Sequence, residues 1–155
     1  MTPLFELLDV TKRYGNQEAL SHVTLRIPPG VTAVVGPNGA GKTTLFGILT
    51  GRIRPTHGEV RFDGHPVDAV RESLGYLFEN PPFYPYLTAD QQLRYYNALR
   101  EHPATNTEVQ RALQHWGVFH SKPIKAFSLG MRKRLGLANA FLGRPRVVIL
   151  DEPFN

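Results

Sequence analysis

The sequence predicts an α/β domain, and three observations support that prediction. Its 155 residues suit one domain of ordinary size. Short apolar runs are interspersed with stretches of helical periodicity, a pattern typical of strands connected by helices. A glycine-rich stretch at residues 36–41 separates one apolar run from one helical stretch, which indicates a strand-to-helix turn.

The first half of the chain is predicted to hold strands and one helix. Two stretches alternate apolar and polar residues and predict antiparallel strands, joined by a turn around Tyr14, Gly15 and Asn16. A following run of five small and branched residues suits a buried strand. The predicted elements are strands at 4–10, 19–27, 31–35 and 58–62 and a helix at 41–53.

The second half is predicted to be mainly helical between two buried strands. Thr88 is a candidate helix cap, because a threonine hydroxyl can accept a bond from an exposed N–H group of the first turn. Gly143 and Pro145 would stop the last helix. The predicted elements are strands at 74–78 and 147–150 and helices at 89–99, 107–116 and 130–142.

Composition excludes several classes of protein. The chain is 41% hydrophobic and contains no cysteine, so disorder, a disulfide framework and a thiolate metal site are excluded. The net charge is +5, but the basic residues are scattered and their densest group is 132–134, which favours a solvated basic face over a nucleic-acid patch. No apolar stretch is long enough to span a bilayer, and residues 1–6 lack a basic signal-peptide start. These features predict a cytosolic chain.

The strongest motif lies between the third predicted strand and the first helix. Residues 36–43 match G-x-x-x-x-G-K-[ST] at every fixed position, and the motif has the strand-to-helix context it requires. Glycines let the backbone N–H groups surround phosphate oxygens, and the helix N-terminus adds positive field. Lys42 would reach the β- and γ-phosphates, and the Thr43 hydroxyl would bind Mg²⁺. The predicted ATP-binding residues here are Gly36, Pro37, Asn38, Gly39, Ala40, Gly41, Lys42, Thr43 and Thr44.

A pair of acids directly follows the last predicted strand. Asp151 and Glu152 end the apolar run 147–150, and an acid at the carboxyl end of a parallel strand lies where such sheets bind ligands. Asp151 is suited to hold Mg²⁺, and Glu152 to act as the catalytic base on water. Alone, the pair could be a solvated turn; beside a phosphate loop, it predicts hydrolysis of Mg-ATP.

The segment between these motifs carries a family resemblance. Residues 127–134 read Phe-Ser-Leu-Gly-Met-Arg-Lys-Arg, which resembles the signature motif of ATP-binding-cassette (ABC) ATPases, whose usual form is Leu-Ser-Gly-Gly-Gln. Ser128 and Gly130 agree with that form, whereas Phe127, Leu129 and Met131 depart from it. All three motifs occur in the family's order and span most of the chain.

The resemblance implies a fold and further site residues. The fold would be the ABC type of P-loop NTPase, with an N-terminal antiparallel β part, a mostly parallel core sheet and a helical subdomain. In the family an aromatic at the position of Tyr14 stacks on adenine. Glu79 occupies the position where most members place a metal-facing glutamine, which implies a third metal-site residue that carries a charge.

The resemblance also implies partners. Two domains would pair head to tail around two ATP molecules, with Ser128, Leu129, Gly130 and Met131 facing the partner's ATP. Residues 79–88, with the 127–131 segment, are similar to bacitracin-resistance-type exporter ATPases, so a separate transmembrane permease is expected. The aromatic residues of this stretch could contact it or be a packed loop. The chain would then lie at the cytoplasmic face of the membrane, with no nucleic-acid partner.

The domain organisation implied is one ABC ATP-binding domain over residues 1–155, partial in this chain. It would comprise a β part with the phosphate-loop core at 1–78, a helical subdomain at 79–142 and the second-acid strand at 143–155. Family members continue after the second acid with another strand and a switch histidine, so we expect an incomplete core sheet and a chain that is a fragment. Two other functions stay open: a non-transport ABC ATPase acting on ribosomes or DNA, and a non-hydrolysing remnant.

Overall fold

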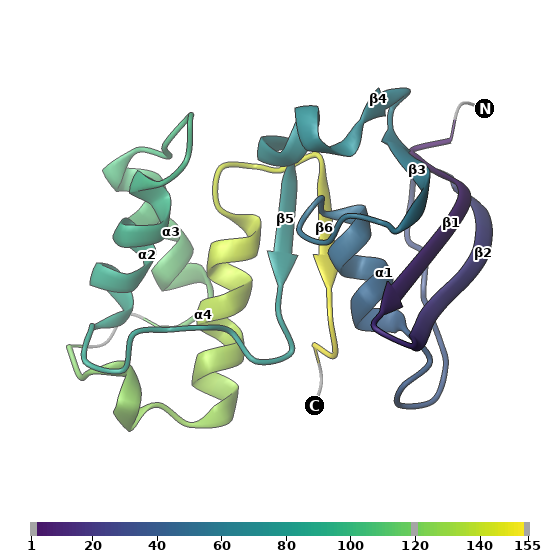
Figure 1. Ribbon diagram of the computed structural model, residues 1–155. Helices are drawn as coiled ribbons and strands as arrows, with labels where there is room; N and C mark the ends of the chain where they lie inside the picture. Colours follow the sequence, from purple (N-terminus) through teal and green to yellow (C-terminus); the bar gives the residue numbers. More distant parts are fainter. Residues whose placement is uncertain (1–2, 119–120, 154–155) are drawn as a thin grey trace. The chain divides into compact units, whose positions relative to one another are not determined.

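A computed structural model describes residues 3–118 and 121–153 (Figure 1). The chain divides into two compact units, residues 1–71 and 72–155. The first contains an antiparallel sheet and a helix, and the second contains a parallel strand pair and helices. The finer boundaries at residues 78 and 142 stay predictions.

The first unit is built on a four-stranded antiparallel sheet. Its strands lie in the order β2 (Gln17–Ile27), β1 (Phe5–Tyr14), β3 (His57–Phe62) and β4 (His65–Pro66). The predicted hairpin is confirmed: Tyr14 pairs with Gln17, and Gly15 in the turn has a φ of 58°. The rest of the unit includes helix α1 (Lys42–Leu49), and the short 3₁₀ helix η1 (Val67–Ser73) follows β4.

Alternating side chains of β1 and β3 build the core of this sheet. Phe5 lies opposite Phe62, with ring centroids 4.9 Å apart, and Leu7 lies opposite Val60. All four side chains are buried. The period of two along each strand places them on one face, which is why the alternation in the sequence predicted these strands.

The strand predicted at residues 31–35 is wrong for this structure. The segment has no strand conformation, and Val31 and Val35 are 104% and 92% exposed. A strand forms where a neighbouring strand pairs its N–H and C=O groups, and neither sheet of the described residues includes this segment. The apolar pattern therefore indicated a strand without supplying its pairing partner.

The second unit combines a parallel strand pair with a helical region. Strand β5 (Leu74–Leu77) runs parallel to β6 (Val147–Leu150), with Leu77 opposite Leu150. In the described residues this sheet consists of these two strands. Helix α4 (Leu129–Phe141) packs on β5 so closely that a Cβ on Gly75 would lie 1.9 Å from the Ala140 carbonyl oxygen.

The helical region lies beside α4 (Figure 1) and shares one core with it. Helices α2 (Ala89–Ala98) and α3 (Asn106–His115) each begin with a capping box, at Thr88 and Thr105, as the sequence predicted for Thr88. A short 3₁₀ helix, η2 (Ile124–Ala126), precedes α4. The shared core consists of Ala89, Leu93, Val109, Leu113, Val118, Ile124, Phe127, Met131, Leu135, Ala138 and Leu142.

Candidate functional site

The glycine-rich loop at residues 36–44 leads directly into α1 in the first unit. The Lys42 ammonium donates hydrogen bonds to the carbonyl oxygens of Gly36 and Pro37, at 2.8 and 3.1 Å. These bonds tie the start of the loop to the first residue of α1. The first N–H groups of a helix have no partner within the helix, so the loop and helix start together offer donors and positive field to an anion.

Gly41 is the N-cap of α1 and fixes the path of the loop. Its φ is 88°, a left-handed conformation, and a Cβ there would lie 2.5 Å from the carbonyl oxygen of Ala19 in β2. Glycine is therefore required twice, by the backbone conformation and by the close approach. Gly39 also has a positive φ, 82°, but a Cβ there would meet nothing within 4 Å.

Tyr14, predicted to stack on adenine, ends β1 in the same unit. Its side chain is half-exposed, and the Lys12 ammonium lies 5.1 Å from its ring centroid. A cation over an aromatic ring is an attractive contact, so part of the ring is already engaged within the chain. Adenine stacking by Tyr14 stays a prediction.

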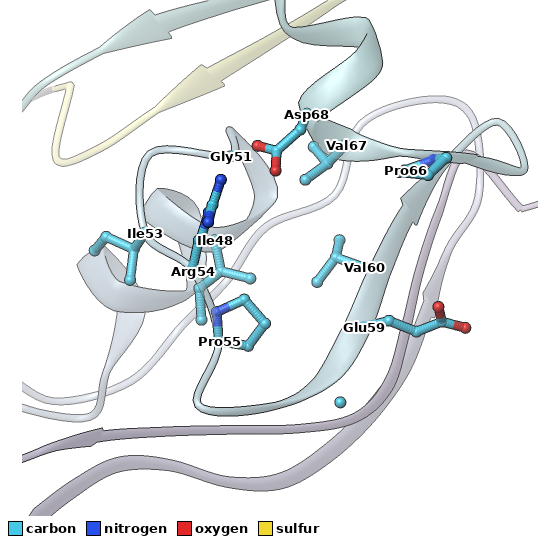
Figure 2. A pocket seen from close by; sticks show the side chains of 11 residues that line it. Ile48, Gly51, Ile53, Arg54, Pro55, Glu59, Val60, Pro66, Val67 and Asp68 are labelled. Carbon is cyan, nitrogen blue, oxygen red and sulfur yellow. The ribbon is translucent and has the colours of Figure 1, made fainter.

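A separate cavity lies at the other end of α1 (Figure 2). Ile48 contributes to it from the last turn of that helix and Gly51 from the turn that follows, and Val60 and Val67 add further aliphatic lining. The phosphate loop instead precedes the N-terminus of α1. The cavity is therefore distinct from the predicted nucleotide site.

Asp151 is held in place at the end of β6 in the second unit. Its N–H group donates to the carbonyl of Leu77 at 3.0 Å, and its side chain is 1% exposed. The Tyr76 hydroxyl donates to Asp151 Oδ2 at 3.2 Å, across the strand pair. The other oxygen, Oδ1, is buried without a hydrogen-bond partner.

The unpartnered oxygen fits a magnesium ligand. A buried carboxylate oxygen without a partner is costly, and Mg²⁺ prefers oxygen ligands from one or two carboxylates, water and substrate phosphates. In the described residues, no group of three or more histidine, cysteine, aspartate and glutamate side chains could hold a metal. The buried Asp151 carboxylate with its unpartnered Oδ1 therefore fits one protein ligand of a magnesium ion.

The other two residues predicted for the metal are exposed. Glu79 lies two residues beyond β5. Because β5 and β6 are parallel, Glu79 and Asp151 both follow the carboxyl end of the strand pair. Thr43 lies in the first unit, near the start of α1. A common metal site for Thr43, Asp151 and Glu79 stays a prediction.

Glu152, the predicted catalytic base, has an unusual backbone. Its φ is 49°, and its carbonyl oxygen accepts a hydrogen bond from the Lys133 ammonium at 2.8 Å. Lys133 is 7% exposed. The prediction of a solvated basic face is thus wrong at Lys133, because α4 places this side chain against the end of β6 rather than in water.

The signature segment forms the start of α4. Ser128 is the N-cap, and its hydroxyl accepts from the Met131 N–H at 3.2 Å. The helix therefore begins one residue earlier than predicted. Leu129 is 61% exposed, whereas the Met131 side chain is buried in the helical core. Only the backbone of Met131 remains suited to face another molecule; contact of Ser128, Leu129, Gly130 and Met131 with a partner's ATP stays a prediction.

Sequence reasoning missed Tyr76 and Lys133. Tyr76 is part of the run predicted as a strand, but its bond to Asp151 joins residues 75 positions apart. Lys133 stands in a basic triplet, and a triplet by itself shows no burial. The available signal was the small residues on its own helix face, Gly136 and Ala140, three and seven positions later.

Comparison with known proteins identifies the family. The family described as ABC transporter matches residues 20–155. The chain belongs to the ABC transporter family. Its resemblance to ABC ATPases, read from the motifs alone, is thereby confirmed.

Individual ABC relatives agree with this assignment. The uncharacterized ABC transporter ATP-binding protein YdbJ of Bacillus subtilis is 36% identical over 99% of this chain and 52% of its own length. The bacitracin transport ATP-binding protein BcrA of Bacillus licheniformis is 35% identical over 100% of the chain and 53% of its own. The sulfate/thiosulfate import protein CysA of Mycobacterium tuberculosis is 35% identical over 99% and 46%. The chain thus spans about half the length of these relatives.

Solved ABC structures confirm the fold. The chain resembles cbiO1 of Clostridium perfringens, part of the transporter complex cbiONQ, with a TM-score of 0.77 and 29% identity over 99% of this chain and 66% of that one. It resembles the dimeric bacterial cassette MJ0796 with a TM-score of 0.85 and 25% identity over 96% and 74%. The described residues contain no helix that is long and apolar enough to cross a membrane.

Proposed function

We propose that the chain binds and hydrolyses Mg-ATP to power a membrane exporter of the ABC family. The observation that supports this best is the buried Asp151 carboxylate with one unpartnered oxygen, in a chain that also carries a closed phosphate loop. A carboxylate in this state is suited to a cation that arrives with its substrate.

In the proposed reaction, the loop at 36–44 binds the phosphates through its N–H groups and Lys42. Glu152 orients a water molecule and accepts its proton as the water oxygen bonds to the γ-phosphorus. The bond from that phosphorus to the bridging oxygen breaks, and ADP leaves with the electron pair. Bound Mg²⁺ would neutralise phosphate charge, and Thr43, Asp151 and Glu79 are the residues that would hold it.

The active form is proposed to be a head-to-tail dimer. The dimeric structure of MJ0796 supports pairing of this chain with a second ABC domain. The start of α4, capped by Ser128, would then direct N–H groups of Leu129 and Gly130 at the partner's γ-phosphate by the physics of a helix N-terminus. Binding of ATP would favour the closed dimer, and hydrolysis would release it.

The transmembrane partner is proposed to contact an aromatic surface formed by Tyr84, Tyr86 and Tyr95. These side chains are 50%, 77% and 44% exposed, and Tyr84 and Tyr95 form an edge-to-face pair with centroids 5.3 Å apart. Exposed aromatic residues favour protein interfaces. The chain would then lie at the cytoplasmic face of the membrane. Co-purification with a multi-span protein would support this proposal, and co-purification with nucleic acid instead would contradict it.

The export direction is proposed from the similarity of residues 79–88 and 127–131 to bacitracin-resistance-type exporter ATPases, and the relative BcrA is a bacitracin transport protein. CysA, an import protein, is equally identical at 35%. Transport assays in inverted vesicles separate the two: ATP-dependent uptake of a peptide antibiotic into the lumen supports export. Uptake only into right-side-out vesicles would overturn it.

Two substitutions test the proposed hydrolysis. Lys42→Ala should weaken ATP binding about 10- to 100-fold, because a charge-assisted contact to phosphate is lost. Glu152→Gln should keep ATP binding, lower kcat by about 10²- to 10⁴-fold and accumulate an ATP-bound dimer. Titration with a fluorescent ATP analogue, phosphate release and size-exclusion chromatography measure these effects.

Lys122→Ala is the matched control, since Lys122 is an exposed lysine outside the loop. It should behave as wild type in each assay. Equal ATP affinity of wild type and Lys42→Ala would refute the phosphate-loop assignment, and unchanged turnover in Glu152→Gln would refute the role of Glu152.

A further inference from the structure

Lys133 is a buried cation on the signature helix. It lies in α4 on the same helix face as Gly136 and Ala140, both of which are buried. Its own side chain is 7% exposed, and its ammonium donates to the carbonyl oxygen of Glu152 at 2.8 Å. Burial of a charged group that donates to a neutral carbonyl is costly, so stability alone gives no reason for a lysine here.

The acceptor of this bond belongs to a strained residue. Glu152 has a φ of 49°, in the left-handed region that residues with a side chain seldom adopt. The next residue is Pro153, and a residue before proline is normally extended with negative φ. Such a conformation persists only where surrounding contacts hold it, and it is typical of functional sites.

We propose that Lys133 is a positioning residue for Glu152, fixing the direction in which the glutamate side chain leaves the backbone. This proposal rests on the proposed role of Glu152 as the base. A donor on the Glu152 carbonyl restrains the peptide plane that follows the residue, and this plane together with φ sets the Cα–Cβ direction. The Tyr76 hydroxyl restrains the adjacent Asp151 in a comparable way, through Oδ2.

The same bond connects, within one unit, two segments that would serve different ATP molecules of the dimer: the signature segment, proposed to face the partner's ATP, and Glu152, proposed to act on the ATP of its own chain. Lys133 lies five residues after Ser128, which caps the helix start. Because a helix is rigid over so short a distance, a displacement of the signature end would move the Lys133 donor and with it the Glu152 carbonyl. The geometry thus ties the position of the catalytic acid to contacts made by the signature segment.

The test compares three variants in the protein as its native gene encodes it. Lys133→Met removes the donor and keeps the length of the side chain, and Lys133→Arg keeps a charged donor. Arg132→Met is the matched control, because Arg132 is the neighbouring basic residue on α4 and is exposed. Each variant is measured for kcat, KM, ATP affinity, thermal unfolding and hydrogen exchange of the peptide containing residues 147–153.

Lys133→Met should lower kcat about 10- to 100-fold, the effect of a small misplacement of a catalytic group, with ATP affinity within about 2-fold of wild type. Its melting temperature should be equal to or above that of wild type, because a buried charge becomes an apolar side chain. Exchange should quicken at 147–153 and stay unchanged in α3. Lys133→Arg should recover most of the turnover, and Arg132→Met should match wild type.

The outcomes separate this proposal from the one on which it rests. If wild type hydrolyses ATP, Glu152→Gln does not, and Lys133→Met retains wild-type kcat and exchange, only the role of Lys133 is overturned. If Lys133→Met melts lower and loses ATP affinity together with kcat, the lysine is structural and the proposal fails. If wild type binds ATP without hydrolysing it, both proposals fail.

Discussion

The phosphate loop and the acidic pair carry the two halves of the proposed chemistry, but they are held in different ways. The loop is closed by contacts close in sequence, such as Lys42 to Gly36 and Pro37. The acids are held by residues remote along the chain: Tyr76 for Asp151 and Lys133 for Glu152. A site whose geometry depends on contacts close in sequence can be predicted from the sequence. A site that depends on tertiary contacts can be predicted only in part.

Glycine substitutions give the largest expected effect. They test whether the conformation of the loop depends only on contacts close in sequence. Gly41→Ala should lower the free energy of unfolding by about 2–5 kcal/mol, from the left-handed φ and from overpacking against Ala19. Gly39→Ala should cost only about 1–2 kcal/mol, because it has the same φ penalty without a clash. Urea unfolding measures both.

If both variants lose the same stability, the approach of β2 to the loop does not matter, and only contacts close in sequence fix the loop conformation. A larger loss of stability in Gly41→Ala than in Gly39→Ala is the expected result. It would show that one tertiary contact, with the Ala19 carbonyl, helps to fix the conformation of the loop.

An intermediate effect is expected at the acidic pair. Tyr76→Phe removes the hydroxyl that orients Asp151, and loss of a residue that orients a metal ligand typically costs about 10- to 100-fold in metal affinity or activity. We therefore expect a higher Mg²⁺ concentration for half-maximal ATPase activity, with binding of ATP in EDTA unchanged.

Tyr95→Phe serves as the control for Tyr76→Phe, since its hydroxyl is at the surface and remote in sequence from the acids. A Mg²⁺ dependence identical to wild type in Tyr76→Phe would show that Asp151 needs no orientation from β5. The contrast between the loop and the acidic pair would then weaken.

The smallest effect is expected at a helix cap, which is local like the loop but outside the site. The Thr105 N–H and hydroxyl donate to the Glu108 carboxylate at 2.9 Å and hold the pKa of Glu108 below its usual value, with Arg144 and Arg111 assisting. A lowered pKa stabilises the fold above the ordinary value of about 4.3, and that stabilisation is lost as the pH falls through the lowered pKa.

Glu108→Gln should therefore be less stable than wild type at pH 6, and the difference should shrink as acidification takes the pH down through the lowered pKa of Glu108 and protonates the carboxylate. Thermal unfolding across this pH range checks this. A difference that persists unchanged in acid would show that the charge of Glu108 contributes nothing to the start of α3.

The fold was predictable wherever its signals were local. The alternation in β1 and β2, the cap at Thr88 and the loop before α1 all appear in short stretches of sequence. Residues 31–35 show the limit of such signals. The apolar run is present, but strand formation depends on a neighbour, and none is paired with it among the described residues.

The sequence by itself determined the family, the phosphate loop and the acids that follow β6, because these depend on residue types at fixed short spacings. Only the tertiary structure decided that Asp151 is buried with one free oxygen, that Lys133 is buried rather than solvated, and that the Glu152 backbone is left-handed. The physical reason is that burial and hydrogen bonding join residues from separate elements. The residue pattern within one helix or strand does not predict how close α4 lies to the end of β6.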